Sequence, residues 1–234
     1  MKILAFDTCF GACSVALLEK GGNNCTVLGA RHEPMQRGHA EALLLMIEDV
    51  LKESGCDVAD LNRIAVTHGP GTFTGVRVGI AAARALALAT GCELVGVGSL
   101  EAIAGVAVDT GAVEKSGSFA VVLDARREQV YLQTFSVVRG QVDPIMPQPV
   151  ICHPDDAGKH LHTGDITLVG SGGPLVTLPD DAVATCVARD IQPDARAVSR
   201  LAATRESGNE TVTPLYLRPP DAKPQTGFAL ERAS

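Results

Sequence analysis

A turn rich in glycine and proline, HGPGTFTGVRVG at residues 68–79, has the residue types best suited to hold an anion. It lies between an apolar run that predicts a strand, residues 63–67, and an Ala-rich segment that predicts a helix over about residues 74–90. Gly69 and Gly71 allow backbone angles that a side chain would forbid, and a helix N-terminus presents backbone N–H groups to a phosphate. The same pattern also fits a tight turn that only packs the helix on the strand.

Other common arrangements for catalysis are missing from the sequence. It contains no Walker P-loop and no GxSxG elbow, so P-loop and serine-hydrolase chemistry are not expected. Its seven cysteines show no CxxC pair or zinc spacing, which predicts reduced thiols. His160 and His162 lie two residues apart near Asp155 and Asp156, and we interpret them as a surface cluster rather than a metal site.

The elements that must position these residues follow from the apolar runs and the turns between them. The predicted order is three strands at residues 2–6, 12–18 and 25–30, a helix at 39–53, a strand at 63–67, the Ala-rich helix, and a strand at 93–97. The turn GGNN joins the second and third strands as a hairpin. Three meandering strands followed by alternating strands and helices indicate an α/β sheet of mixed direction.

A second unit begins near Ser118 and repeats the pattern of the first. FAVVLDARREQVYLQTFSVVRG matches KILAFDTCFGACSVALLEKGG as a strand ending in Asp, a turn and a second strand, so Asp124 falls where Asp7 fell. Such self-similarity indicates duplication, although so simple a pattern also arises by chance. We predict two lobes, residues 1–108 and 118–234, and a second lobe that is short of helices.

Composition limits the classes of function. The net charge of −7 and the pI near 5.3 make the chain a poor candidate to bind nucleic acid tightly by itself. Asp7 interrupts the first apolar run too early for a signal peptide. Arg77 and Arg84 argue against a membrane span in the Ala-rich helix. We therefore expect a cytoplasmic protein.

Four stretches resemble one known family. GPGTFTGVRVGIAAARALA is similar to the signature of the TsaB (YeaZ) family, bacterial proteins of threonylcarbamoyladenosine tRNA modification. ILAFDTCFGACSVAL, LDARREQVY and PLYLRPPDAKP agree with it. The resemblance implies the two-lobed actin-like (ASKHA, RNase H-like) α/β fold of actin and sugar kinases. In that fold a strand-strand-strand-helix-strand-helix unit is duplicated, and here the second lobe is reduced.

The same resemblance suggests a degenerate nucleotide site. In relatives with this fold, a carboxylate after the first strand lies beside the metal-bound phosphates, and Asp7 fills that place. Such a site for ATP or ADP, at the interface of a complex, would use Asp7, Thr8, Gly69, Gly71 and Gly172. The alternative is that Asp7 and the GSGG turn at residues 170–173 only turn the chain.

The resemblance also implies that the catalytic metal site is missing. TsaD, the catalytic paralogue, carries two metal-binding histidines four residues apart, where this chain has Ser99 and Ile103. An isoleucine offers no lone pair to a metal, and the neighbouring Glu101 does not form a site alone. The chain is therefore expected to be a pseudoenzyme and not the transferase itself.

Association is the remaining expectation. The two predicted helices are apolar on more than one face, and in the TsaB family they form the dimer surface. Close helix approach is expected at glycines spaced four apart. The predicted interface residues are Leu43, Met46, Ile47, Val50, Gly75, Gly79 and Ala83.

The resemblance implies four partners: TsaD, the ATPase TsaE, a second copy of the chain when it is alone, and tRNA through the complex only. The predicted function is support of threonylcarbamoyl transfer to an anticodon-loop adenosine. The alternative is a stand-alone enzyme, either a small-molecule kinase or a glycoprotease-type peptidase.

Overall fold

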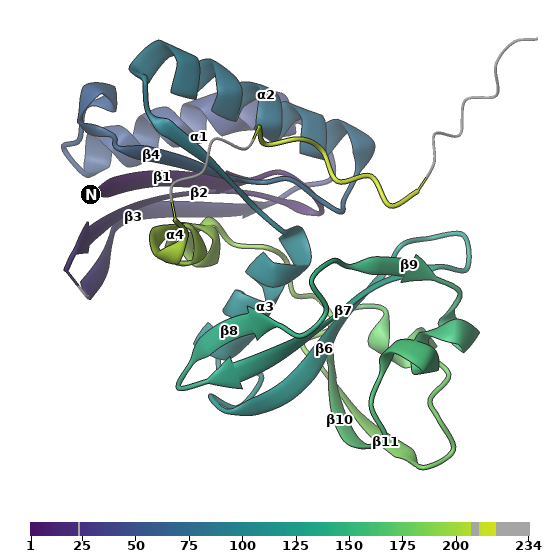
Figure 1. Ribbon diagram of the computed structural model, residues 1–234. Helices are drawn as coiled ribbons and strands as arrows, with labels where there is room; N and C mark the ends of the chain where they lie inside the picture. The colour runs from purple at the N-terminus through teal and green to yellow at the C-terminus, as the bar shows by residue number, and fades with distance from the viewer. Residues whose placement is uncertain (23, 207–210, 219–234) are drawn as a thin grey trace, which may run out of the picture.

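Two β-sheets, one in each lobe, organise the chain (Figure 1). The computed structural model describes residues 1–22, 24–206 and 211–218. The first sheet has the order β3-β2-β1-β4-β5. Its strands are β1 Lys2–Asp7, β2 Ala12–Gly21, β3 Asn24–Pro34, β4 Arg63–Thr67 and β5 Glu93–Val97. β1 pairs antiparallel with β2 and parallel with β4, so the predicted mixed direction is confirmed.

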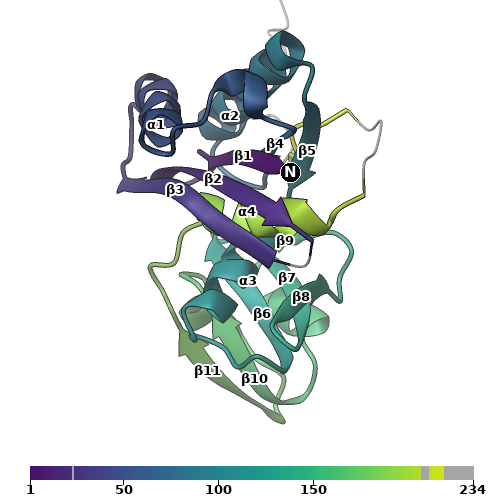
Figure 2. The same ribbon diagram turned by 90° about the vertical axis from the view of Figure 1, so that its left-hand side faces the viewer.

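Helices cover both faces of the first sheet. α1 (His39–Glu53) and α2 (Phe73–Thr90) lie on one face, and α4 (Ala195–Thr204) lies on the other, as the turned view in Figure 2 also shows. A strand between two helical layers is buried on both sides, which is why residues 3–6 of β1 are a continuous apolar run. Leu4 and Phe6 pack in the cluster under α1 and α2, whereas Ile3 and Ala5 pack against α4.

The second sheet repeats the order of the first. It runs β11-β10-β6-β7-β8, with β9 paired to β7. Its strands are β6 Gly117–Asp124, β7 Val130–Val138, β8 Gln141–Pro144, β9 Val150–Cys152, β10 Gly164–Val169 and β11 Ala182–Val187. Counted in chain order, and leaving out β9, each sheet has the order third, second, first, fourth, fifth. This agreement confirms the predicted duplication, because it extends to five strands and not only to the hairpin.

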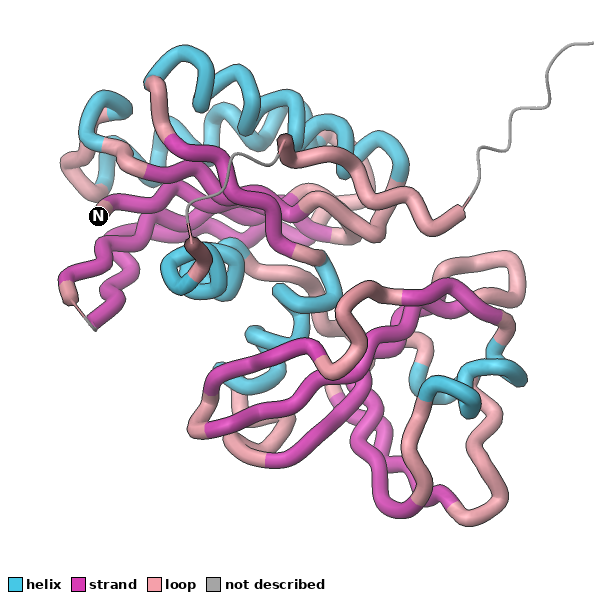
Figure 3. Tube along the Cα trace, in the orientation of Figure 1, coloured by secondary structure: helices cyan, strands magenta, loops and turns pink. Residues whose placement is uncertain are grey.

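The second lobe is reduced, as predicted. Where the first lobe has α1 and α2, the second has β9 and the short 3-10 helices η2 (Pro154–His160) and η3 (Gly173–Leu175), drawn as brief cyan turns in Figure 3. A further 3-10 helix, η1 (Val58–Asp60), precedes β4.

The last helix of each unit packs on the sheet of the other unit. α3 (Ser99–Asp109) follows β5 but contacts β6, β7 and β8, and α4 follows β11 but contacts β1 and β2. The two helices also contact each other, and a Cβ at Gly105 would lie 3.2 Å from the Cβ of Ala197. The chain thus returns to the first lobe after β11. The range 118–234, predicted as the second lobe, therefore includes α4, which packs on the sheet of the first lobe.

α2 is long and apolar enough to cross a membrane by length and composition alone. In the fold it packs on β4, and its buried residues are Gly75, Val76, Gly79, Ile80 and Ala83. These contacts account for the apolar residues on one face of the helix, and only 28% of the helix is buried.

Candidate functional site

The glycine–proline turn connects β4 to α2 and is held by backbone hydrogen bonds. Thr72 caps α2, since its side-chain oxygen accepts a hydrogen bond from the Gly75 N–H at 3.1 Å. The Thr72 N–H donates to the Cys9 carbonyl at 2.7 Å. The Leu215 N–H donates to the His68 carbonyl at 2.8 Å. The turn is therefore joined both to the β1–β2 connection and to the C-terminal segment.

Asp7 lies at the end of β1 and is fully buried. Its Oδ1 accepts hydrogen bonds from the Cys9 N–H at 3.1 Å and from the Thr67 hydroxyl, whereas Oδ2 has no hydrogen-bond partner among the described residues. Burial raises the pKa of Asp7 from 3.8 to about 6, because an ionised carboxylate loses its hydration there, and the two hydrogen bonds oppose the rise. Asp7 is thus a fully buried carboxylate with one oxygen unpaired within the described part of the chain.

The glycines predicted to approach a ligand instead approach the chain's own backbone. A Cβ at Gly69 would lie 2.7 Å from the Leu215 carbonyl oxygen, and one at Gly71 would lie 2.6 Å from the Cys9 carbonyl oxygen. Gly172, in the second lobe, would meet the Leu123 backbone at 2.8 Å. These surroundings support the interpretation as packing turns. Nucleotide binding at these residues stays a prediction.

Thr8 explains the spacing of small residues along α2. Its hydroxyl donates to the Gly75 carbonyl at 2.6 Å, and its own carbonyl oxygen occupies the space that a Cβ at Gly75 would need. A Cβ at Gly79 would lie 2.7 Å from the Thr8 hydroxyl oxygen. The close approach predicted at Gly75 and Gly79 is real, but it brings the β1–β2 connection and not another helix against α2.

Nucleophilic catalysis by Cys9 is not supported by its surroundings. The thiol is buried and lies 3.2 Å from the Thr67 hydroxyl oxygen. Burial raises the pKa of Cys9 well above its usual value, and the carboxylate of Asp7 raises it further. A reactive thiolate needs the opposite shift.

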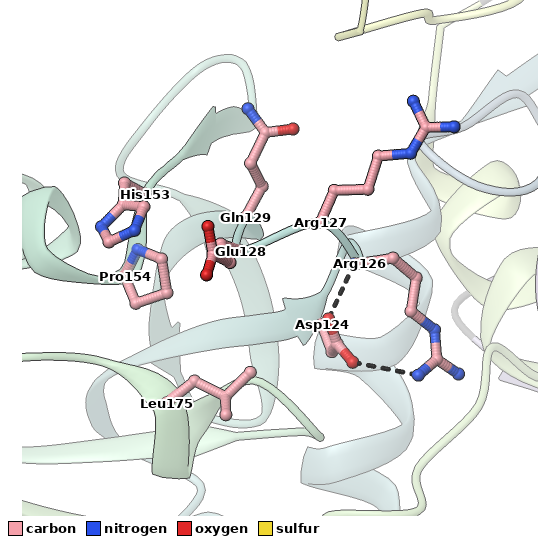
Figure 4. A pocket seen from close by; sticks show the side chains of 8 residues that line it. All are labelled: Asp124, Arg126, Arg127, Glu128, Gln129, His153, Pro154 and Leu175. Atoms are coloured by element: carbon pink, nitrogen blue, oxygen red, sulfur yellow. Dashed lines mark hydrogen bonds and ion pairs between the residues drawn. The ribbon is translucent and has the colours of Figure 1, made fainter.

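Asp124 occupies the matching position at the end of β6. Its Oδ1 accepts a hydrogen bond from the Arg126 N–H at 2.7 Å, and its own N–H donates to the Ser171 hydroxyl at 3.1 Å. Figure 4 shows an open hollow beside this turn, lined by Asp124, Arg126, Arg127, Glu128, Gln129, His153, Pro154 and Leu175. The lining charges are mixed in sign, so they do not favour a ligand of one charge.

Arg218 contacts the same turn from the C-terminal segment, and no motif predicted it as a site residue. Its guanidinium donates to the Gln129 side-chain oxygen at 2.7 Å and to the Ala125 carbonyl at 3.0 Å. The only signal in the sequence is an arginine placed after an apolar run, LYLR, more than 80 residues from its partners.

Ser99 and Ile103, where the resemblance predicts that metal-binding histidines are missing, lie in the core. Ser99 and Ile103 are both fully buried, and the Ser99 hydroxyl donates to the Pro70 carbonyl. Glu101 forms an ion pair with Arg205 at 2.5 Å, so a guanidinium already neutralises that carboxylate. Among the residues that the structure describes, no three His, Cys, Asp or Glu side chains come together as metal ligands.

The predicted interface needs a correction, because its residues are buried within the chain. On α1 these are Leu43, Met46, Ile47 and Val50, and on α2 they are Gly75, Gly79 and Ala83. The exposed apolar residues of these helices are different ones: Leu44 (59% exposed), Leu45 (63%) and Leu88 (89%). The apolar spacing of this helix predicts Leu44 on the inward stripe and Met46 off it, but the structure reverses the two: Met46 is 4% exposed and Leu44 is 59% exposed.

Comparisons with known proteins agree with this architecture. The family model described as TsaD, tRNA N6-adenosine threonylcarbamoyltransferase, matches residues 29–160, which is more than half of the chain. The tRNA threonylcarbamoyladenosine biosynthesis protein TsaB of Escherichia coli is 33% identical, over 93% of this chain and 95% of the relative. A tRNA N6-adenosine threonylcarbamoyltransferase of Erythrobacter litoralis is 48% identical over 31% of this chain and 21% of its own length.

Solved structures show the same likeness over nearly the whole chain. YeaZ from Pseudomonas aeruginosa superposes with a TM-score of 0.78 at 29% identity and covers 92% of this chain and 99% of its own. A second Pseudomonas aeruginosa structure, with similarity to peptidase YeaZ, gives 0.79 at 30% identity, covering 93% and 99%. These structures and the two sheets confirm the predicted two-lobed actin-like fold. The chain belongs to the TsaB family, whose members take part in tRNA threonylcarbamoyladenosine biosynthesis.

Proposed function

We propose that this chain is a non-catalytic partner subunit of the complex that transfers a threonylcarbamoyl group to N6 of an anticodon-loop adenosine, in tRNAs that read codons beginning with A. The observation that carries the proposal is the buried pair Ser99 and Ile103, where the catalytic paralogue has metal-binding histidines. A TsaD-type subunit then performs the transfer, and a TsaE-type ATPase resets the complex, with ATP or ADP bound at the complex interface. The complex works in the cytoplasm.

The exposed face of α1 and α2 supports the choice of a protein partner. The two helices contact each other on the same face of the first sheet. Leu44, Leu45 and Leu88 are exposed on these helices, and large apolar side chains exposed near one another favour association with a partner. α2 carries only the basic residues Arg77 and Arg84, whereas the charges of α1 are mostly acidic. Such a surface fits TsaD, or in its absence a second copy of this chain.

We expect the double substitution Leu45→Glu and Leu88→Glu to weaken binding to a TsaD-type partner by at least about 100-fold, because two unpaired carboxylates would be buried in the complex. Titration of the purified subunits measures the affinity. Both sites are exposed, so the unfolding free energy should change by no more than about 0.5 kcal/mol per site. Val138→Glu, at an exposed position of β7 in the second lobe, is the matched control. Unchanged affinity in the folded double variant would contradict this surface.

Depletion of the protein is expected to lower threonylcarbamoyladenosine in cellular tRNA, measured by mass spectrometry of nucleosides. The purified chain alone should show no transferase, kinase or peptidase activity.

The purified chain should bind tRNA only weakly, with a Kd of about 10⁻⁴ to 10⁻⁶ M and strong salt dependence, because its net charge of −7 repels a polyanion. Normal modification after depletion would rule out the proposed role, and activity of the lone chain would favour the enzyme alternative.

A further inference from the structure

The C-terminal segment, residues 211–218, runs from the first lobe toward the second. In Figure 1 it is the yellow stretch that leaves the first lobe beside α2. The Val212 carbonyl accepts a hydrogen bond from the Arg84 guanidinium at 2.7 Å, and the Leu215 N–H donates to the His68 carbonyl at 2.8 Å. Val212 is buried in the core under α1 and α2. The segment is therefore a fixed part of the first lobe up to Leu215.

Tyr216 continues this attachment at the first residue of α2. Its ring stacks on Phe73, with the ring centroids 5.5 Å apart and the planes inclined by 25°. The Arg77 guanidinium lies 3.7 Å from the Phe73 centroid, and its Nε donates to the Tyr216 hydroxyl at 2.8 Å. Stacked aromatic rings with a cation over one of them form a stable arrangement even where they are partly exposed.

Two residues later, Arg218 is attached to the second lobe. Besides its bonds to Ala125 and Gln129, its Nη2 donates to the Arg126 carbonyl at 3.2 Å. One guanidinium thus holds both ends of the turn that follows β6. The planar fork of arginine suits several acceptors at once, which a lysine ammonium matches poorly.

The turn that Arg218 holds is strained. Arg126, Arg127 and Glu128 have φ values of 64°, 56° and 56°, three consecutive left-handed residues without a glycine. L-residues disfavour this conformation, and it persists only where the surroundings impose it. Inside the turn, the Ala125 N–H donates to the Gln129 carbonyl at 2.9 Å, and the Gln129 N–H donates to the Arg126 carbonyl at 3.2 Å.

We propose that residues 211–218 act as a strap that holds the left-handed turn of the second lobe in a fixed position relative to α2. Tyr216 and Arg218 are separated by one residue. A chain segment this short spans only about 7 Å when extended, so it has little slack between its two attachments. Release of the strap at Tyr216 therefore loosens the turn in the other lobe, and release at Arg218 loosens the N-terminal end of α2.

Hydrogen–deuterium exchange on the full-length protein tests the strap. Tyr216→Ala is expected to accelerate exchange of the Ala125 and Gln129 amides by about tenfold, because the turn opens more often once its support moves. Tyr216 is 44% exposed, so this variant should fold. Tyr216→Phe keeps the ring stack and loses only the hydrogen bond from Arg77, so its exchange should rise much less than that of Tyr216→Ala. Ala85→Ser, at an exposed position of the same helix, should also leave the turn unchanged.

The reverse experiment uses Arg218→Ala, which should accelerate exchange at the Gly75 and Val76 amides in the first turn of α2. Arg189→Ala, which removes an exposed arginine after β11, controls for the loss of one positive charge. Wild-type exchange of the turn in Tyr216→Ala, together with wild-type exchange of α2 in Arg218→Ala, would show that the two attachments are independent and would overturn the proposal. Faster exchange of the turn in Tyr216→Ala and of α2 in Arg218→Ala, with the controls at wild-type rates, would support the proposal.

Discussion

Replacement of Gly75 by alanine is expected to lower the free energy of unfolding by about 3 kcal/mol or more. The added Cβ would overlap the Thr8 carbonyl oxygen and would lie 2.6 Å from the Thr72 hydroxyl oxygen. The carbonyl belongs to the backbone of the β1–β2 connection, which is buried and cannot move aside without disturbing Asp7. Helix propensity alone predicts the opposite sign, a gain of about 1 kcal/mol for alanine in a helix interior.

Urea unfolding followed by circular dichroism gives the comparison, provided that the m-value stays constant. Ala85→Gly, at an exposed position of the same helix, should cost only about 1 kcal/mol, since it changes propensity without changing packing. Gly79→Ala should have an intermediate cost, because the nearest atom is the Thr8 side-chain oxygen, which can rotate away. A Gly75→Ala variant more stable than the wild type would contradict the packing described for this helix.

Short sequence patterns were sufficient to predict most helices and strands of the first lobe. The bounds predicted for α1, β4 and β5 agree with the structure, because each element is an apolar run closed by a glycine or a polar turn. The repeated strand–Asp–turn–strand pattern also predicted the duplicated hairpin correctly, with Asp124 placed at the end of β6 as Asp7 is at the end of β1. Sequence patterns of this kind report on neighbours within about 20 residues.

Contacts between distant segments were not predictable in the same way. The pattern of α1 placed Leu44 on the inward stripe and Met46 off it, and this was wrong, because both lie among apolar neighbours and packing on the sheet decides between them. The glycines of α2 correctly predicted a close approach, but Thr8, 67 residues away from Gly75, makes it. α3 and α4 each pack on the sheet of the other lobe. This packing depends on how both lobes are arranged, and no single stretch of sequence encodes that arrangement.

Asp7 offers the second test, since a buried carboxylate with a raised pKa should destabilise the fold at neutral pH. Its pKa is about 6 in the folded chain, against 3.8 for an ordinary aspartate. Above pH 6 the carboxylate is ionised in both states and is more costly in the folded one, by about 3 kcal/mol at 1.4 kcal/mol per pH unit. As the pH falls from 6 to 3.8 the folded state takes up the proton first, so this cost disappears.

We therefore expect Asp7→Asn to increase the free energy of unfolding by up to about 3 kcal/mol at pH 8, with the gain shrinking through pH 6 and vanishing near pH 4. The carboxamide oxygen still accepts from the Cys9 N–H and the Thr67 hydroxyl, so those hydrogen bonds are retained. Urea unfolding of both proteins between pH 4 and 8 measures the difference, in which all other titrating groups cancel. Asp124→Asn should give no such gain, because that side chain is 30% exposed and pairs with Arg126. A wild type that is more stable than Asp7→Asn at pH 8, and loses this advantage at low pH, would mean that the pKa of Asp7 is lowered. The carboxylate would then be a stabilising group held by its two hydrogen bonds, and burial would not be the dominant effect on it.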